Sequence, residues 1–127
     1  MGHRVTPEFI RELQNGQVFV FGSNGAGAHM GGAAYAAVRH FGAIMGQAEG
    51  MQGDSYAINS MDGLEVLREQ AERFVDYAKA HPERTFLVTP IGCGIAGYEP
   101  EEVAPLFAEA VGVENVWLPQ SFWDVLS

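Results

Sequence analysis

The side chains of this sequence that could take part in chemistry lie in or beside glycine-rich segments and at the ends of predicted strands. His29 could accept or donate a proton near neutral pH, and Cys93 could act as a nucleophile if its thiol were ionised. Asp62 and Glu99 carry carboxylates that could activate a water molecule. Each residue also has a structural role open to it: an exposed loop residue for His29, a small buried thiol for Cys93, and a helix cap for the two acids.

Two glycine-rich segments, each directly after an apolar run, are the most informative feature of the sequence. The first glycine loop, residues 21–32, reads FGSNGAGAHMGG, and the second glycine loop, residues 91–98, reads IGCGIAGY. A strand, a glycine loop and a helix in succession form the anion-binding crevice of many α/β sheets. Neither segment has the lysine of a P-loop, and the glycine spacing does not fit the dinucleotide-binding fingerprint. We therefore expect two anion-binding loops of another class.

The pattern of apolar residues predicts a single α/β domain over residues 1–127. Unbroken apolar runs predict buried strands, and 3.6-residue periodicity predicts helices between them. Because helices join the strands, we expect a three-layer α/β/α sandwich around a small, mainly parallel sheet. The expected strands are residues 18–21, 56–58, 85–89 and 116–118, the expected helices are residues 6–15, 33–41, 64–78 and 100–111, and residues 42–53 are expected to form a loop.

The charge of the chain argues against one class of partner. The sequence has 7 Lys and Arg against 16 Asp and Glu, for a formal net charge of −9, and it has no basic cluster. Binding to a nucleic-acid backbone requires many cations that neutralise phosphates, so we expect neither DNA nor RNA as a partner. A small anion can still bind to backbone N–H groups.

The sequence also bears on the compartment of the protein and on membrane, metal and cofactor binding. The N-terminus lacks the apolar core of a signal peptide, and no apolar run approaches the roughly 20 residues that span a bilayer. The single cysteine fits a reducing compartment. We expect a cytoplasmic protein with no membrane partner, no metal ion and no cofactor.

The two glycine loops and their flanks resemble parts of macrodomains, the ADP-ribose-binding modules. In that family a small-residue–Asn turn ends a strand and leads through a glycine-rich loop into an Ala-rich helix. A later strand leads into a glycine turn, an aromatic residue, and a helix that starts with Pro and acids. The resemblance spans roughly residues 17–112, and it extends to a compact phage and bacterial branch. The matching segments are Gly22-Ser23-Asn24 with residues 25–38, residues 87–98 with Glu99-Pro100-Glu101-Glu102, and Ser55-Tyr56-Ala57-Ile58.

This resemblance implies that the protein binds ADP-ribose or a related nucleotide in a cleft between the two loops. Asn24 would contact a distal ribose hydroxyl from one wall, and Tyr98 would stack on or cap that ribose from the other. The glycines would let backbone amides approach the diphosphate. The implied ligand-binding residues are Gly22, Ser23, Asn24, Gly25, Gly27, Gly31, Gly32, Ile91, Gly92, Cys93, Gly94, Ile95, Ala96, Gly97 and Tyr98.

The base-binding part of the macrodomain pattern differs here. The Asp that contacts the adenine amine in the family has no equivalent before Val18, and Asp124 could take its place. Phe122 and Trp123 follow the last predicted strand, where they could either stack on the base or dock onto the core.

The catalytic part of the pattern differs as well, because residues 31–35 lack the acid that the hydrolytic branch places beside the first loop. Ligand binding without turnover is therefore the first expectation. One alternative is hydrolysis of an ADP-ribosyl bond by water activated at His29, Asp62 or Glu99. The other is a non-catalytic structural or assembly protein on an α/β scaffold.

Overall fold

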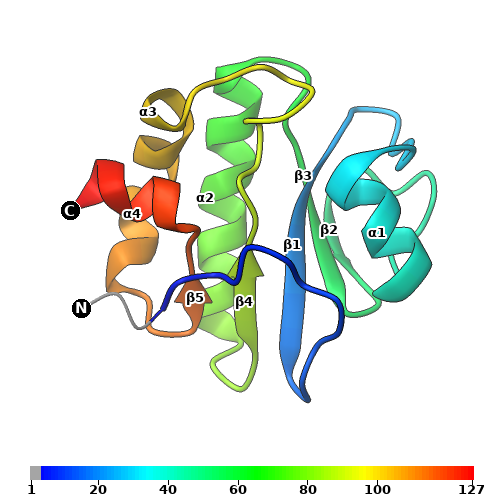
Figure 1. The fold of residues 1–127 in the computed structure, drawn as a ribbon, viewed down its shortest axis with the longest axis horizontal. Helices are drawn as coiled ribbons and strands as arrows, with labels where there is room; N and C mark the ends of the chain where they lie inside the picture. The colour runs from blue at the N-terminus through cyan, green and yellow to red at the C-terminus, as the bar shows by residue number, and fades with distance from the viewer. Residues whose placement is uncertain (1–3) are drawn as a thin grey trace.

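The protein, seen in a computed structural model that describes residues 4–127, is an α/β domain built on a mixed five-stranded sheet (Figure 1). The strand order is β2-β3-β1-β4-β5, and β2 alone pairs antiparallel with its neighbour. The strands are β1 (Gln17–Ser23), β2 (Gly50–Gln52), β3 (Ser55–Asn59), β4 (Thr85–Val88) and β5 (Val116–Trp117). The helices are α1 (Gly32–His40), α2 (Leu64–Ala80), α3 (Pro100–Val103), the 3-10 segment η1 (Ala104–Gly112) and α4 (Gln120–Leu126).

The centre of the sheet brings both glycine loops to one edge. β1 pairs in parallel with β3 on one side and β4 on the other, with Val20 opposite Tyr56 and Val88. Because the carboxyl ends of parallel strands meet at the same edge, the segments that follow β1, β3 and β4 lie together. This pairing confirms the predicted parallel core of the sheet.

The side chains of β1 alternate between two cores. Val18 and Val20 face a cluster built with α2, η1 and α4, while Phe19 and Phe21 face a smaller cluster with α1. Figure 1 shows the helices on opposite faces of the sheet accordingly, with α1 on one side and α2 on the other. A strand buried on both faces is apolar throughout, and this explains the unbroken apolar run of β1.

The predicted helix over residues 6–15 is wrong. Thr6 donates its N–H to the Leu118 carbonyl at 2.9 Å, and Val5 forms a parallel bridge with Leu118 beside β5. Ile10 and Leu13 pack against the core cluster of α1. A helix of about ten residues is marginal by itself, and here pairing with β5 and packing of two apolar side chains take its place.

Three further expectations differ from the structure. The predicted loop 42–53 contains β2, an edge strand whose Gly50 lies opposite Ala57. The predicted helix after Pro100 becomes mainly 3-10 structure, because Pro105 has no N–H to continue an α-helical ladder. Residues 120–126 form α4, which the sequence did not indicate. No helix within residues 4–127 is long and apolar enough to cross a membrane.

Candidate functional site

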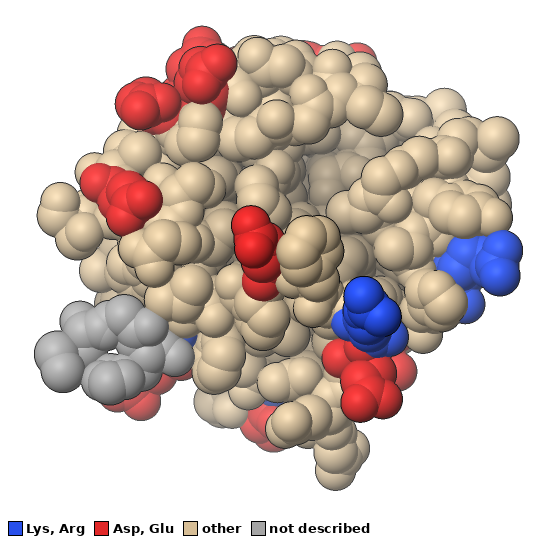
Figure 2. Space-filling view, viewed as in Figure 1, with Lys and Arg blue, Asp and Glu red and all other residues tan. Residues whose placement is uncertain are grey.

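A cavity of about 310 Å³, the first cavity, lies between the two glycine loops at the carboxyl edge of the sheet. Figure 2 shows this face hollowed between the second loop and α1, and the atoms around the hollow belong to neither acidic nor basic residues. The predicted ligand-binding residues that line the cavity are Gly22, Ser23, Asn24, Gly31, Gly32, Gly92, Gly94, Ile95 and Ala96. The structure therefore brings the two loops together as opposite walls of one space.

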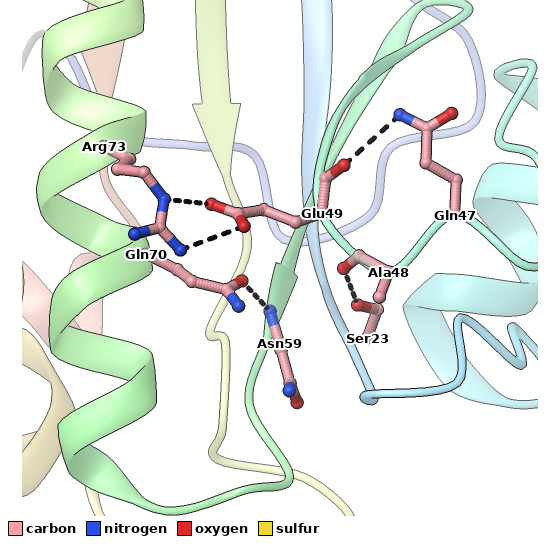
Figure 3. Close-up of polar contacts among 7 residues, drawn as sticks. All are labelled: Ser23, Gln47, Ala48, Glu49, Asn59, Gln70 and Arg73. Atoms are coloured by element: carbon pink, nitrogen blue, oxygen red, sulfur yellow. Dashed lines mark hydrogen bonds and ion pairs between the residues drawn. The ribbon is translucent and has the colours of Figure 1, made fainter.

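The polar side chains in the wall of the first cavity serve mainly to hold the scaffold. The hydroxyl of Thr89 donates to the Val20 carbonyl at 2.8 Å, and the hydroxyl of Ser60 donates to the Ser23 carbonyl at 3.4 Å. Ser23 in turn donates its hydroxyl to the Ala48 carbonyl (Figure 3). No Asp, Glu, Lys, Arg or His side chain is among the described residues that line the cavity.

Backbone amides are what the first cavity offers to a ligand. Within residues 4–127 the N–H groups of Gly32, Ala33 and Ala34 donate no hydrogen bond, because they form the first turn of α1 and Gly31 caps that helix without a side chain. The N–H groups of residues 92 and 94–96 in the second loop likewise find no acceptor among the described residues. All of these residues line the cavity. Unpaired amides on two walls, one set at a helix N-terminus without an acidic residue, favour an anion.

Asn24 organises the first loop through its side chain. Its Oδ1 accepts the N–H of Ala28 at 2.9 Å and that of Ala26 at 3.2 Å, and its Nδ2 donates to the Ala28 carbonyl at 3.1 Å. Its φ is not positive, so the conformational tolerance of Asn is not what the position requires. Asn24 lies in the cavity wall as predicted, with its amide oxygen engaged by its own loop.

His29 points away from the first cavity and into the protein. Its ring is 1% exposed and meets the edge of Phe21 at a centroid distance of 5.1 Å. Nε2 lies 3.1 Å from the Gln47 carbonyl and 3.2 Å from Gln52 Oε1, and Nδ1 has no hydrogen-bond partner within residues 4–127. Gln52 Oε1 also accepts the Ile44 N–H at 2.8 Å, which identifies this atom as the amide oxygen. Because an amide oxygen can only accept, the proton of the His29–Gln52 hydrogen bond is on Nε2 of His29. His29 therefore joins the first loop to residues 44–52. It is buried, and not the exposed loop residue that was the structural alternative to a catalytic role.

Gly27, a predicted ligand contact, serves close packing of backbone, whereas Gly25, another predicted contact, lies beside the side chain of Asp62. Gly27 has φ +66°, and a Cβ there would lie 2.5 Å from the Gly46 carbonyl carbon. The Gly27 carbonyl accepts the Gly46 N–H at 2.8 Å. A Cβ on Gly25 would lie 2.6 Å from Asp62 Oδ2. Neither glycine is among the residues that line the first cavity.

The segment behind the first loop is fixed to α2. Glu49 forms a two-pronged ion pair with Arg73, with Nε–Oε2 at 2.7 Å and Nη2–Oε1 at 3.0 Å (Figure 3). Gln70 of the same helix accepts the Asn59 N–H at 2.7 Å. Burial and the nearby Glu49 carboxylate raise the pKa of Tyr56 to about 12. The ion pair and the hydrogen bond attach the start of β2 and the end of β3 to α2.

Cys93 and its neighbours form the inner part of the second loop. Burial, followed by the carboxylates of Glu99 and the acids after it, raises the pKa of the Cys93 thiol, which disfavours the thiolate that a nucleophile needs. Ile91 is buried in the core, and Tyr98 packs against the same core. Gly97 has φ +81°, a left-handed conformation that turns the loop. These four residues are absent from the lining of the first cavity.

The two predicted catalytic acids lie outside the cavity lining as well. Asp62 is exposed, and its Oδ2 accepts a hydrogen bond from Asn59 Nδ2 at 2.7 Å. Glu99 is the N-cap residue of α3, and its N–H donates to the Glu102 carboxylate at 2.9 Å. His29, Asp62 and Glu99 are therefore not brought together around the first cavity.

A second cavity of about 940 Å³ has some lining residues in common with the first one. Its walls come from residues 5–11, the first turns of α1, and residues 119–121, and the lining is mostly apolar. The two cavities share Gly32, Ala33, Thr89 and Pro90.

The C-terminal residues predicted to reach a base have other partners. Phe122 is fully buried and packs on Phe107, with ring centroids 5.8 Å apart. Trp123 donates its Nε1–H to the Arg4 carbonyl at 2.9 Å, and Asp124 accepts a hydrogen bond from Gln120. Docking of the tail onto the core is the alternative that the structure supports.

Several cavity residues were missed by the sequence prediction. Ser60 directly follows β3, and Thr89, the last residue of the predicted strand 85–89, directly follows β4. A position at the end of a strand was the available signal for both. Met30 and Met61 line the cavity with exposed side chains; Met30 belongs to the first glycine loop and Met61 comes after Ser60 at the end of β3, so position was the available signal for them as well. No group of three or more His, Cys, Asp or Glu residues that could hold a metal ion occurs within residues 4–127.

A scan against protein-family models found no match, and searches of curated proteins and of solved structures found no significant match either.

Proposed function

We propose that this protein binds ADP-ribose or a related nucleotide, with its diphosphate between the two glycine loops, on a macrodomain-like three-layer α/β/α scaffold. The observation that carries the proposal is the pair of unpaired amide sets, at residues 32–34 and at residues 92 and 94–96, on the walls of the first cavity. An anion that binds there replaces water as the acceptor of these N–H groups and meets the positive end of the α1 dipole.

The two cavities suit the two chemical halves of such a ligand. Among the residues that the structure describes, no charged side chain lines the first cavity, and those residues can neutralise a diphosphate there only through backbone dipoles. The second cavity is larger and mostly apolar, as the site of a flat heterocycle would be. Since residues of α1 and the start of the segment after β4 line both cavities, the proposal places one ligand across the two.

Binding rather than hydrolysis is proposed because of where the titratable groups lie. A general acid or base must come within hydrogen-bond reach of the atom it protonates or deprotonates, directly or through one water. His29 is buried in a polar cluster behind the first loop, and neither Asp62 nor Glu99 lines the first cavity.

Substitution of Gly31 by Asp tests the proposal with two opposite effects. Gly31 has an extended backbone, and a Cβ there meets nothing closer than 3.8 Å, so Asp fits as an N-cap residue. The carboxylate would occupy the free amides of α1, which stabilises the fold by a few tenths of a kcal/mol to about 1 kcal/mol. The same carboxylate would repel the diphosphate. We expect the melting temperature to rise and the ADP-ribose affinity, measured by calorimetry, to fall at least tenfold.

Gly31→Ala is the matched control, because it adds a Cβ without an oxygen or a charge. It should bind ADP-ribose within about threefold of the wild-type affinity, since a methyl group there blocks no amide. An absence of ADP-ribose binding by the wild-type protein at high micromolar ligand would refute the proposed function. Equal binding by the Gly31→Asp variant and the wild type would show that the α1 amides are not the binding site.

A further inference from the structure

The N-terminal segment from residue 5 to residue 11 crosses the second cavity as a strap that is fixed at both ends. At one end Thr6 and Leu118 are joined by a backbone hydrogen bond of 2.9 Å, and Arg4 caps the Val113 carbonyl at 2.6 Å. At the other end Leu13 packs into the core cluster of α1. Figure 1 shows this segment running from β5 past β4 and then back to the start of β1. The strap therefore has a fixed position over the cavity although it has no helix or strand of its own.

Phe9 is the one large apolar side chain of the strap that the fold leaves without a partner. Its ring is 81% exposed, whereas Ile10 and Leu13 on the same segment pack against the core. Phe9 is also one of the residues that line the second cavity. An exposed Phe forgoes the free energy that its burial would contribute, so a ring held at the rim of an apolar cavity has surface available for a ligand.

We propose that Phe9 is the stacking residue of this site, and that the aromatic base of the bound nucleotide lies in the second cavity against its ring. This inference rests on the proposed function, because a diphosphate between the glycine loops would place the rest of the ligand beside Ala33 and Pro90, which line both cavities. Phe122 and Trp123 are engaged in the core and with Arg4, which leaves Phe9 as the free aromatic residue among those that line the second cavity.

The chemistry of the strap favours a base over a charged or flexible group. Stacking on an aromatic ring requires a flat π-surface and no particular hydrogen-bond pattern, so Phe9 selects for a heterocycle without fixing which one. The strap carries the ring on a segment without regular structure, anchored on both sides, so the side chain can reorient while its backbone stays in place.

The test compares two ligands and three variants by calorimetry. ADP-ribose carries a base, and ribose 5-phosphate carries a phosphate and a sugar without one. Phe9→Ala should weaken ADP-ribose binding by about 5- to 160-fold, the range that base–aromatic stacking contributes, and leave ribose 5-phosphate binding unchanged. Phe9→Trp should keep the ADP-ribose affinity, and the emission of the new Trp should change when ADP-ribose is added. Tyr35→Ala is the matched control, because Tyr35 is a 47% exposed aromatic residue of α1 that lines neither cavity.

The outcomes separate this inference from the proposed function. If the wild type binds ADP-ribose and Phe9→Ala binds it equally well, the stacking role of Phe9 is wrong and the proposed function stands. Equal weakening of both ligands by Phe9→Ala would also overturn the inference, because a base-specific contact cannot affect ribose 5-phosphate. If the wild type binds neither ligand, the proposed function fails and the stacking role of Phe9 falls with it. The inference is supported if Phe9→Ala loses affinity for ADP-ribose and not for ribose 5-phosphate, and if Tyr35→Ala loses affinity for neither ligand.

Discussion

The two walls of the first cavity are built in different ways. The first loop is tied to the protein through the Asn24 amide, the His29 ring and the close contact of Gly27 with Gly46. The second loop has unpaired amides, an Ile95 side chain that is 82% exposed, and space around Gly94. We infer that the first wall is rigid in the free protein and that the second wall can adjust to what binds.

This difference bears on how a charge-free cavity can bind an anion. Backbone amides stabilise an anion only where their geometry is set before binding, since ordering a loop costs conformational entropy. A rigid first wall supplies preorganised amides at the start of α1. The second loop has backbone hydrogen bonds of its own, from the Gly97 N–H to the Gly94 carbonyl and from the Tyr98 N–H to the Gly92 carbonyl, so adjustment to a ligand is expected at residues 94–96.

Gly27→Ala should have the largest effect on stability of the substitutions considered for these walls. The residue has φ +66°, and its new Cβ would lie 2.5 Å from the backbone of Gly46, which cannot move aside as a flexible side chain can. The left-handed conformation and the overlap together should lower the free energy of unfolding by about 2–4 kcal/mol. Urea unfolding followed by circular dichroism measures this loss. A loss under 1 kcal/mol would show that residues 44–47 yield easily, and the first wall would then not be rigid.

The rigid wall is also where prediction from sequence met its limit. The strands before both loops and the helix after the first loop were predictable, because the unbroken apolar runs of β1 and β4 and the helical periodicity of α1 are local signals. The contact between Gly27 and Gly46 is not local, so two glycines that pack backbone against backbone were taken for ligand contacts or loop residues. The same holds for the strap of residues 5–11, whose apolar spacing also fits a helix until the pairing of Val5 with Leu118 is known.

His29→Ala should be the next most destabilising change. The substitution leaves a space beside Phe21 and removes a donor from the Gln47 carbonyl and from Gln52 Oε1. Both oxygens keep another donor, so the main cost is the cavity, and we expect a loss of about 2–3 kcal/mol in the free energy of unfolding. Thermal unfolding of His29→Ala and of the exposed control His40→Ala measures it. Equal stability of the two variants would show that His29 does not help to hold the first wall.

Asn24→Ala should have an intermediate effect on stability and a clear effect on binding. The variant loses the hydrogen bonds that shape residues 24–28. Because water can replace Asn24 as the partner of the loop N–H groups, the free energy of unfolding should fall by only about 1–2 kcal/mol. A loop that must be ordered by the ligand binds it more weakly, so ADP-ribose affinity should fall by roughly tenfold. Asn24→Asp is the control, since its carboxylate can still accept the N–H groups of Ala26 and Ala28. The rigid-wall account predicts that Asn24→Asp keeps more stability than Asn24→Ala, and the reverse order would contradict it.

Gly94→Ala should have the smallest effect on stability, and it completes the comparison from the other wall. Gly94 does not have a positive φ, and a Cβ there meets nothing within 4 Å, so the free energy of unfolding should stay within about 0.5 kcal/mol of the wild-type value. Gly94→Ala adds a methyl group to the second wall, just as Gly27→Ala adds one to the first, so the two variants can be compared directly in the same unfolding assay. If both changes cost 2 kcal/mol or more, the second loop is as constrained as the first, and adjustment to the ligand must come from elsewhere. If only Gly27→Ala is costly, the glycines of the two loops have different reasons to be there: close packing of backbone in the first, and open access to backbone amides in the second.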